Sequence, residues 1–148
     1  DKISFQTALI AKAETIASKR DLLVALGRGH AKATVFALEN PDAAVRIHYK
    51  RYPEQKPNGV DDATAIAQGR NALTARLANM RIDNMAIKRD KWGYMDKVDV
   101  ETYLGMLQEI GSIDKSLQAS GIYTNELIND INRFDVQAVR KLAREYKG

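Results

Sequence analysis

The chain has 148 residues, 45% of them apolar and 28% charged, so it is long enough to form one domain with a hydrophobic core. No apolar run approaches the roughly 20 residues of a membrane-spanning helix, and the lack of cysteine excludes disulfides, thiolate metal sites and a cysteine nucleophile. The 23 basic residues are interleaved with 19 acidic ones, so the net charge of +4 forms no concentrated patch and nucleic acid is not an expected partner.

The first predicted element is a β-strand at residues 3–11, where apolar residues first alternate with polar ones and then run continuously. Nearly everything after it predicts helix, and a lone strand cannot satisfy its own backbone hydrogen bonds. We therefore expect this strand either to pair with sequence outside the chain or to self-associate with a second copy through its open edge.

A helix is predicted over residues 20–39, and two glycines, Gly27 and Gly29, lie inside it. Glycine there costs about 1 kcal/mol relative to alanine, and the close approach of another element is the usual reason to keep it. Four apolar residues recur on one side and are expected to face the core: Leu22, Leu26, Ala33 and Phe36.

A sharp corner is predicted at Asn40 and Pro41. Proline cannot continue a helix, so the first helix should end near Glu39, but proline is well suited to the first position of a new helix. Asn40 is expected to cap that second helix through its side-chain oxygen, and Pro53 should end it.

A turn is predicted at residues 55–60 from its composition, and Asp61 or Asp62 is expected to cap a third helix after it. The apolar residues of this helix recur at intervals of three to four: Ile66, Leu73, Leu77 and Met80.

The regular pattern is lost over residues 81–95, and Asp96 then opens a fourth helix that Gly111 ends. A short helix is expected to begin at the capping residue Thr124, and Asp135 should cap a last helix. The inward residues of that last helix are expected to be Val136, Val139, Leu142, Ala143 and Tyr146. The sequence thus predicts a mostly α fold of about six helices and one N-terminal strand, in a single domain over residues 1–148.

Catalytic chemistry has little support in the sequence. The two histidines, His30 and His48, are 18 residues apart with no acidic residue one turn away on a shared face, which favours structural or surface roles over metal binding. No serine lies in a nucleophile elbow, and the glycines of residues 27–30 lack the spacing of a nucleotide-binding loop. We therefore expect no catalytic residue, metal or cofactor.

The segment "KWGYMD" at residues 91–96 is the candidate binding segment, because Trp92 and Tyr94 flank a glycine in an irregular stretch. Aromatic rings with one polar group bind small organic ligands well, so both are predicted as ligand-binding residues. The alternative is structural: Trp92 would anchor the loop on the core while Asp96 caps the next helix.

Taken in order, four stretches resemble the C-terminal part of bacterial ABC-importer substrate-binding proteins of the nitrate, sulfonate, taurine and thiamine-precursor group. Proteins of that group have three similar features in the same order. These are an Asn-Pro corner between two helices, then an aromatic-Gly-x-x-Asp segment, and then a Tyr-Thr-Asn motif. The resemblance covers residues 13–148. The stretches are "GRGHAKATVFALENPDAAVRIHYKRYP", "KWGYMDKVDVETYLGMLQEIGSI", "IYTNELI" and "FDVQAVRKLAREYK".

This resemblance implies a fragment of a type II periplasmic-binding-protein fold, in which two α/β lobes are hinged around a ligand cleft. Members of the group are about twice as long as this chain, so the resemblance implies that the chain is the C-terminal portion of such a receptor. The intact protein would bind a small polar or anionic solute outside the cytoplasm, in the periplasm, and deliver it to a membrane permease. Because the chain starts at Asp1, the absence of a signal peptide says nothing against export.

Two alternatives to the receptor remain open. Relatives of the thiamine-precursor binders include enzymes that make the pyrimidine precursor with a pyridoxal phosphate lysine, although no lysine here lies in a recognisable cofactor context. A free-standing helical interaction module, acting on nucleic acid through its positive charge, is the second. The sequence leaves sulfonate, nitrate, amidine-like pyrimidines and aromatic acids open as solutes.

Overall fold

The computed structural model describes residues 8–78, 80, 82 and 90–147. This part of the chain is mostly helical, as predicted, and contains no strand. Most of the predicted strand at residues 3–11 lies outside the described residues, and residues 8–11 have no regular structure. The α-helices are α1 (Ala13–Ser18), α2 (Arg20–Glu39), α3 (Pro41–Arg51), α4 (Asp62–Leu77), α5 (Lys97–Glu109), α6 (Ile128–Ile131) and α7 (Val136–Glu145). Two short 3-10 helices complete the set, η1 (Pro53–Gln55) and η2 (Ala119–Gly121).

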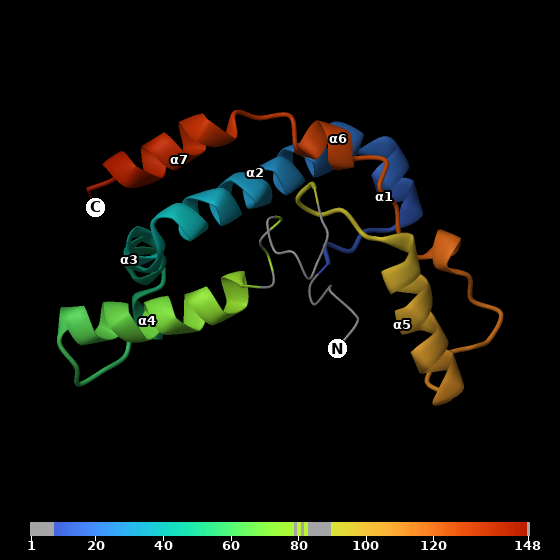
Figure 1. Cartoon of the computed structure of the whole chain (residues 1–148), viewed down its shortest axis with the longest axis horizontal. Helices are drawn as coiled ribbons and strands as arrows, with labels where there is room; N and C mark the ends of the chain where they lie inside the picture. Colours follow the sequence, from blue (N-terminus) through green and yellow to red (C-terminus); the bar gives the residue numbers. More distant parts are fainter. Residues whose placement is uncertain (1–7, 79, 81, 83–89, 148) are drawn as a thin grey trace.

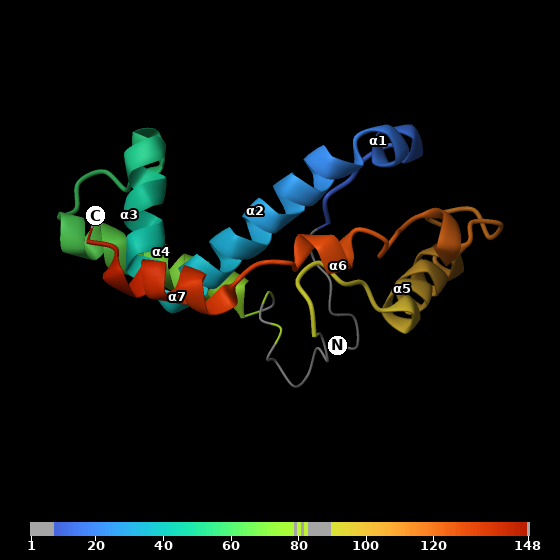
Figure 2. The ribbon, with the colours of Figure 1, turned by 90° about the horizontal axis from the view of Figure 1, so that it is seen from above.

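Helix α2 is the central element, and α1, α3, α4, α6 and α7 all contact it. Helix α7 runs beside α2, α3 turns away from its C-terminal end, and α4 packs against α3 (Figures 1 and 2). Helix α5 lies at the opposite end of the molecule from α3 and α4, where it packs against η2. We refer to α1–α4, α6 and α7 together as the scaffold.

The corner between α2 and α3 is confirmed, and Asn40 does more there than the sequence predicts. Its Oδ1 accepts a hydrogen bond of 3.1 Å from the backbone N–H of Ala43, which caps α3, and Pro41 is the first residue of that helix. Its Nδ2 donates a 2.8 Å hydrogen bond to the carbonyl of Ala143 in the last turn of α7. One side chain therefore joins the ends of three helices.

The two glycines of α2 have different surroundings. A Cβ on Gly27 would lie 2.6 Å from Cδ1 of Ile131, so the glycine lets α6 approach α2 closely, as expected. A Cβ on Gly29 would have no atom of another element within 4 Å, so close approach does not explain that glycine. Gly69 in α4 repeats the first case, because its Cβ would lie 2.6 Å from a methyl group of Val45 in α3.

The predicted core face of α2 is wrong: Leu22, Leu26 and Ala33 are exposed, and only Phe36 is partly buried. Leu22 and Leu26 are 62% and 56% exposed, whereas Val24, Ala31 and Val35 are buried. The helix carries two apolar stripes, and α6 and α7 pack on the one that contains Gly27. Periodicity alone shows that both stripes exist but not which one the neighbouring helices cover. In α7, similarly, Ala143 is buried but Leu142 is 60% exposed.

The remaining helix ends follow the predictions with one exception. Asp61, Asp96 and Asp135 each accept hydrogen bonds from backbone N–H groups of the helix that follows. Gly111, at φ 73°, ends α5 in a Schellman motif. Thr124 does not begin a helix: its hydroxyl accepts from the N–H of Glu126 in a turn, and α6 begins only at Ile128. A threonine hydroxyl serves such turns and helix caps equally well.

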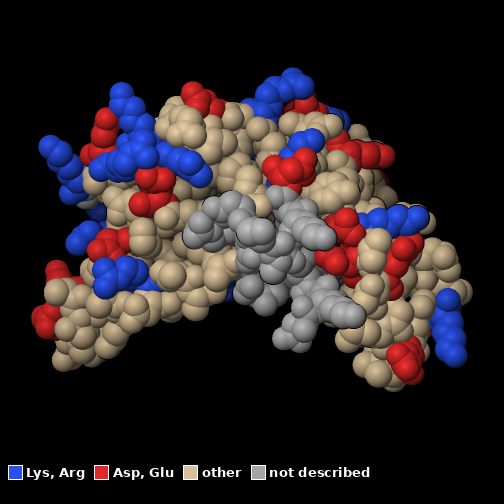
Figure 3. Space-filling model, viewed as in Figure 1, with Lys and Arg blue, Asp and Glu red and all other residues tan. Residues whose placement is uncertain are grey.

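The accessible surface is large for the chain's mass. It is 10606 Å², compared with roughly 7,500 Å² for a compact monomer of this size. The buried core of the described residues consists mainly of alanine, valine and leucine, and no large side chain there is completely buried. On the face shown in Figure 3, acidic and basic side chains are intermixed with one another among residues of other kinds.

Candidate functional site

The loop at residues 90–96 contains the predicted binding segment, residues 91–96. Gly93 has φ 83°, a conformation that residues with a side chain rarely adopt. A Cβ on this glycine would also lie 3.2 Å from Cδ1 of Ile128. Glycine therefore lets the loop turn and lie close against the segment that contains α6.

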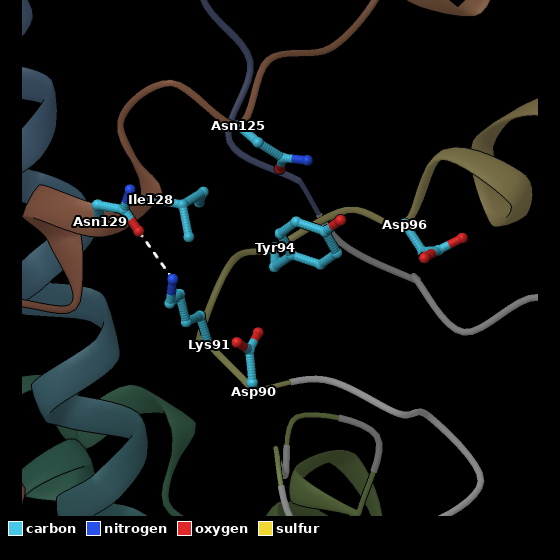
Figure 4. Close-up of a pocket in the computed structure, with 7 residues that line it drawn as sticks. All are labelled: Asp90, Lys91, Tyr94, Asp96, Asn125, Ile128 and Asn129. Atoms are coloured by element: carbon cyan, nitrogen blue, oxygen red, sulfur yellow. Dashed lines mark hydrogen bonds between the residues drawn. The ribbon is translucent and has the colours of Figure 1, made fainter.

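Three asparagines hold this loop in place. The side-chain amide of Asn132 accepts from the N–H of Trp92 and donates to its carbonyl, at 3.0 and 2.9 Å. The amide of Asn125 makes the same pair of bonds with Met95, at 3.1 and 2.8 Å. Asn125 and Asn132 thus each satisfy one backbone donor and one backbone acceptor of the loop, as the backbone of a neighbouring strand would. The third, Asn129, accepts a 2.8 Å hydrogen bond from the ammonium group of Lys91 (Figure 4).

A half-open hollow of about 480 Å³ lies between the loop and the asparagine segment. Its walls carry one ammonium group, two carboxylates, two carboxamides, one phenol ring and one aliphatic side chain, which gives the lining a formal charge of −1. Four residues come from the loop and three from residues 125–129, and they surround the hollow from both sides (Figure 4). They are Asp90, Lys91, Tyr94, Asp96, Asn125, Ile128 and Asn129.

The structure places the two predicted ligand-binding aromatics differently. Tyr94 lines the hollow, with its ring between the loop and the asparagine segment (Figure 4). Trp92 does not line it: its ring packs against Phe134 at 5.8 Å between centroids. The indole Nε1 of Trp92 is buried and has no hydrogen-bond partner among the described residues. Asp96 caps α5, so the structural alternative describes Trp92 and Asp96 well, while ligand binding by either aromatic stays a prediction.

A cluster of charges fixes α6 against α2 and so positions the asparagines. Arg20 donates a 2.6 Å hydrogen bond to the carboxylate of Asp130, and Arg28 donates to the backbone carbonyl of the same residue at 2.7 Å. The bond from Arg20, with the nearby charges of Arg133 and Arg28, lowers the pKa of Asp130. This carboxylate is therefore ionised at neutral pH and holds α6 in register with α2.

The asparagines of the hollow are not among the predicted site residues, although the sequence carries a signal for them. Asn125, Asn129 and Asn132 recur at intervals of four and three residues, the spacing of one helical face. Only residues 128–131 are α-helical, but the turn before them keeps the three side chains directed toward the loop. Ile128 shares this face and packs against the loop, so the face combines one apolar contact with amides that can donate and accept hydrogen bonds.

The histidines lie away from this hollow, and His48 shares a 2.7 Å hydrogen bond with Gln55. Among the described residues no group of three or more histidine, aspartate or glutamate side chains is placed to hold a metal ion. Likewise, no helix in that part of the chain combines the length and apolar character needed to cross a membrane.

In comparisons with known proteins, no protein-family model, curated protein or solved structure matches this chain.

Proposed function

We propose that the chain is the C-terminal part of the extracytoplasmic solute-binding component of an ABC importer. The observation that carries this proposal is that two of the motifs behind the resemblance meet in space. Asn125 of the Tyr-Thr-Asn motif binds the backbone of Met95, inside the aromatic-Gly-x-x-Asp segment 30 residues earlier. Together these motifs form the walls of the one hollow described above.

The third motif supports the proposal in another way. The corner at Asn40 and Pro41 joins α2, α3 and the end of α7, so it sets the geometry of the scaffold rather than a binding surface. A receptor lobe needs such rigid joints, because its ligand is held by loops that a stable frame positions.

The lining of the hollow suits a small polar solute. Asp90 offers a carboxylate, and Tyr94 offers a ring face with a hydroxyl group. The carboxylate of Asp96 already caps α5, and Oδ1 of Asn129 already accepts from Lys91. Nitrogen donors of a solute would be well matched by Asp90 and Tyr94, whereas a bare anion such as nitrate would meet two carboxylates and one ammonium group. Among the solutes left open by the sequence, amidine-like pyrimidines fit this lining better than nitrate does.

Exposed apolar surface supports the expectation that more of the protein covers this chain. Leu22 and Leu26 form an uncovered apolar stripe on α2, and the accessible surface exceeds that of a compact monomer by roughly 3,000 Å². In the intact receptor a second lobe would close over the solute by a hinge motion, and the loaded form would dock on a membrane permease.

The test is calorimetric titration of the natural full-length gene product with taurine, nitrate, an alkyl sulfonate and an aminopyrimidine. We expect one of these solutes to bind, and we expect the Tyr94→Ala variant to bind it at least tenfold more weakly. Tyr52→Ala is the matched control, because Tyr52 is 43% exposed, directly follows α3 and does not line the hollow. A full-length product that binds none of the four solutes would remove the proposal.

A further inference from the structure

The C-terminal half of α3 carries cations that no acidic side chain balances. Basic and acidic residues are interleaved over the chain as a whole, but residues 43–53 contain no acidic residue. Arg46, Lys50 and Arg51 are exposed, and in the part of the chain that the structure describes none of them forms an ion pair. Arg51 lies over the ring of Tyr52, 5.5 Å from its centroid, and this contact leaves its formal charge unbalanced.

These three cations share one side of the helix with an exposed isoleucine. Residues four apart in a helix lie on the same side, so Lys50 lies beside Arg46 and Arg51 lies beside Ile47. Ile47 is 40% exposed, whereas Val45 packs against α4 on the opposite side of the helix. Figure 2 shows α3 standing out from one end of the molecule. We refer to the three cations and Ile47 together as the α3 face.

The architecture of the chain explains this face only in part. Cations in the last turn of a helix complement the negative end of its dipole, which accounts for Lys50 and Arg51. The dipole does not account for Arg46, which lies more than one turn before the end of the helix, or for the exposed Ile47. Arg46 and Lys50 are also four residues apart, a spacing at which like charges repel each other and destabilise a helix. A negatively charged partner removes this repulsion.

We propose that the α3 face docks on a membrane surface that contains anionic phospholipid. The three cations lie at the headgroup phosphates, and Ile47 enters the boundary between the headgroups and the acyl chains. Ile47 favours a membrane over nucleic acid, because an aliphatic side chain cannot stack on bases as an aromatic ring does. A membrane also supplies what both kinds of side chain in the face need, negative charge at the surface and an apolar layer beneath it.

The charges set the strength of this docking. One lysine or arginine near an anionic membrane strengthens binding about fivefold, so the three cations together give roughly 100-fold. This attraction is screened by salt, whereas the contribution of Ile47 is apolar and is not. The docking is a property of α3 and does not involve the hollow at residues 90–96. Membrane docking and solute binding can therefore fail independently of each other.

The experiment is flotation of the chain with lipid vesicles at low salt. One set of vesicles contains phosphatidylglycerol and phosphatidylcholine in equal parts, and the other contains phosphatidylcholine alone. The face variant combines Arg46→Gln, Lys50→Gln and Arg51→Gln. The matched control replaces three exposed lysines at the opposite end of the molecule by glutamine and so lowers the net charge equally. These control positions are Lys12, Lys97 and Lys115. Circular dichroism of both variants checks that their helices are retained.

We expect the unsubstituted chain to float with the vesicles that contain phosphatidylglycerol and not with phosphatidylcholine alone. The face variant should bind roughly 100-fold more weakly, and the control variant should lose much less. Ile47→Ser should weaken binding by a similar factor at low and at raised salt. Equal losses for the face and control variants would show that net charge alone acts, and would overturn the proposal. Failure of the unsubstituted chain to bind either kind of vesicle would also overturn it, and so would binding to a single-stranded oligonucleotide alone.

Discussion

Asn40 tests whether one side chain stabilises two helix ends at once. The Asn40→Ala variant removes both the cap of α3 and the hydrogen bond to the carbonyl of Ala143. The Asn40→Ser variant keeps a good capping oxygen but is too short and lacks the amide donor, so it removes only the second bond. Comparison of the two variants separates the two roles at one position.

The expected magnitudes follow from the geometry. Loss of a helix N-cap costs about 1 kcal/mol of unfolding free energy. The bond to Ala143 is 2.8 Å long and partly buried, and the residue that carries the carbonyl is completely buried, so its loss should cost about 1 kcal/mol more. We therefore expect losses of about 2 kcal/mol for Asn40→Ala and about 1 kcal/mol for Asn40→Ser.

The assay is urea unfolding followed by far-ultraviolet circular dichroism. Asp135→Ala serves as the control, because the side chain of Asp135 caps only α7, through the N–H of Ala138. It should cost about 1 kcal/mol. The reasoning fails if Asn40→Ala costs no more than this control, or if the serine and alanine variants at position 40 are equally destabilised.

Three other changes test the packing and the charges of α6. Gly29→Ala should stabilise the chain by up to about 1 kcal/mol, whereas Gly27→Ala should give no gain or a loss because its Cβ would meet Ile131. Urea unfolding should therefore find Gly29→Ala the more stable of the two variants, and the reverse order would contradict this. Because the pKa of Asp130 is lowered, its contribution to the free energy of unfolding is complete above the ordinary pKa of 3.8 and is lost as the pH falls through the lowered value. The free energy of unfolding measured across acidic pH should therefore change less steeply for Asp130→Asn than for the unsubstituted chain. Equal slopes would contradict this. Asn132→Ala should speed amide hydrogen exchange at Trp92, because the N–H of Trp92 loses its acceptor, and should leave exchange at Met95 unchanged because Asn125 still accepts from that N–H. An equal increase at both residues would show that the two asparagines do not act separately.

The sequence predicts this fold well where a single residue decides the local structure. Pro41 and the aspartates at positions 61, 96 and 135 begin helices as expected, because capping depends on a few adjacent backbone groups. Gly111 ends α5 for the same kind of reason, since it adopts a positive φ. Thr124 marks the limit of such reasoning, because a threonine hydroxyl can stabilise a turn or a helix and the residues around it decide which forms.

The sequence predicts the fold less well where a helix has two apolar faces and the docking of a distant segment decides which face is buried. Both stripes of α2 are apolar, and the choice between Leu22 and Val24 as a core residue depends on where α6 docks. That docking depends in turn on Gly27, and on Arg20 and Arg28 meeting Asp130 more than 100 residues away. No local pattern connects these residues, so their pairing could not be read from either segment alone.

The candidate site shows the same division between local and distant information. Tyr94 is predicted from its own neighbourhood, because loops carry binding residues more often than their share and an aromatic ring with a polar group suits small organic ligands. The residues opposite it were missed, because Asn125 acquires its role only when the loop at Met95 lies against it. A single asparagine whose amide bonds a distant stretch of backbone cannot be recognised from the residues beside it or from that stretch. Three asparagines at intervals of four and three residues can be recognised. Their spacing in residues 125–132 is therefore the feature by which this hollow could be sought in other sequences.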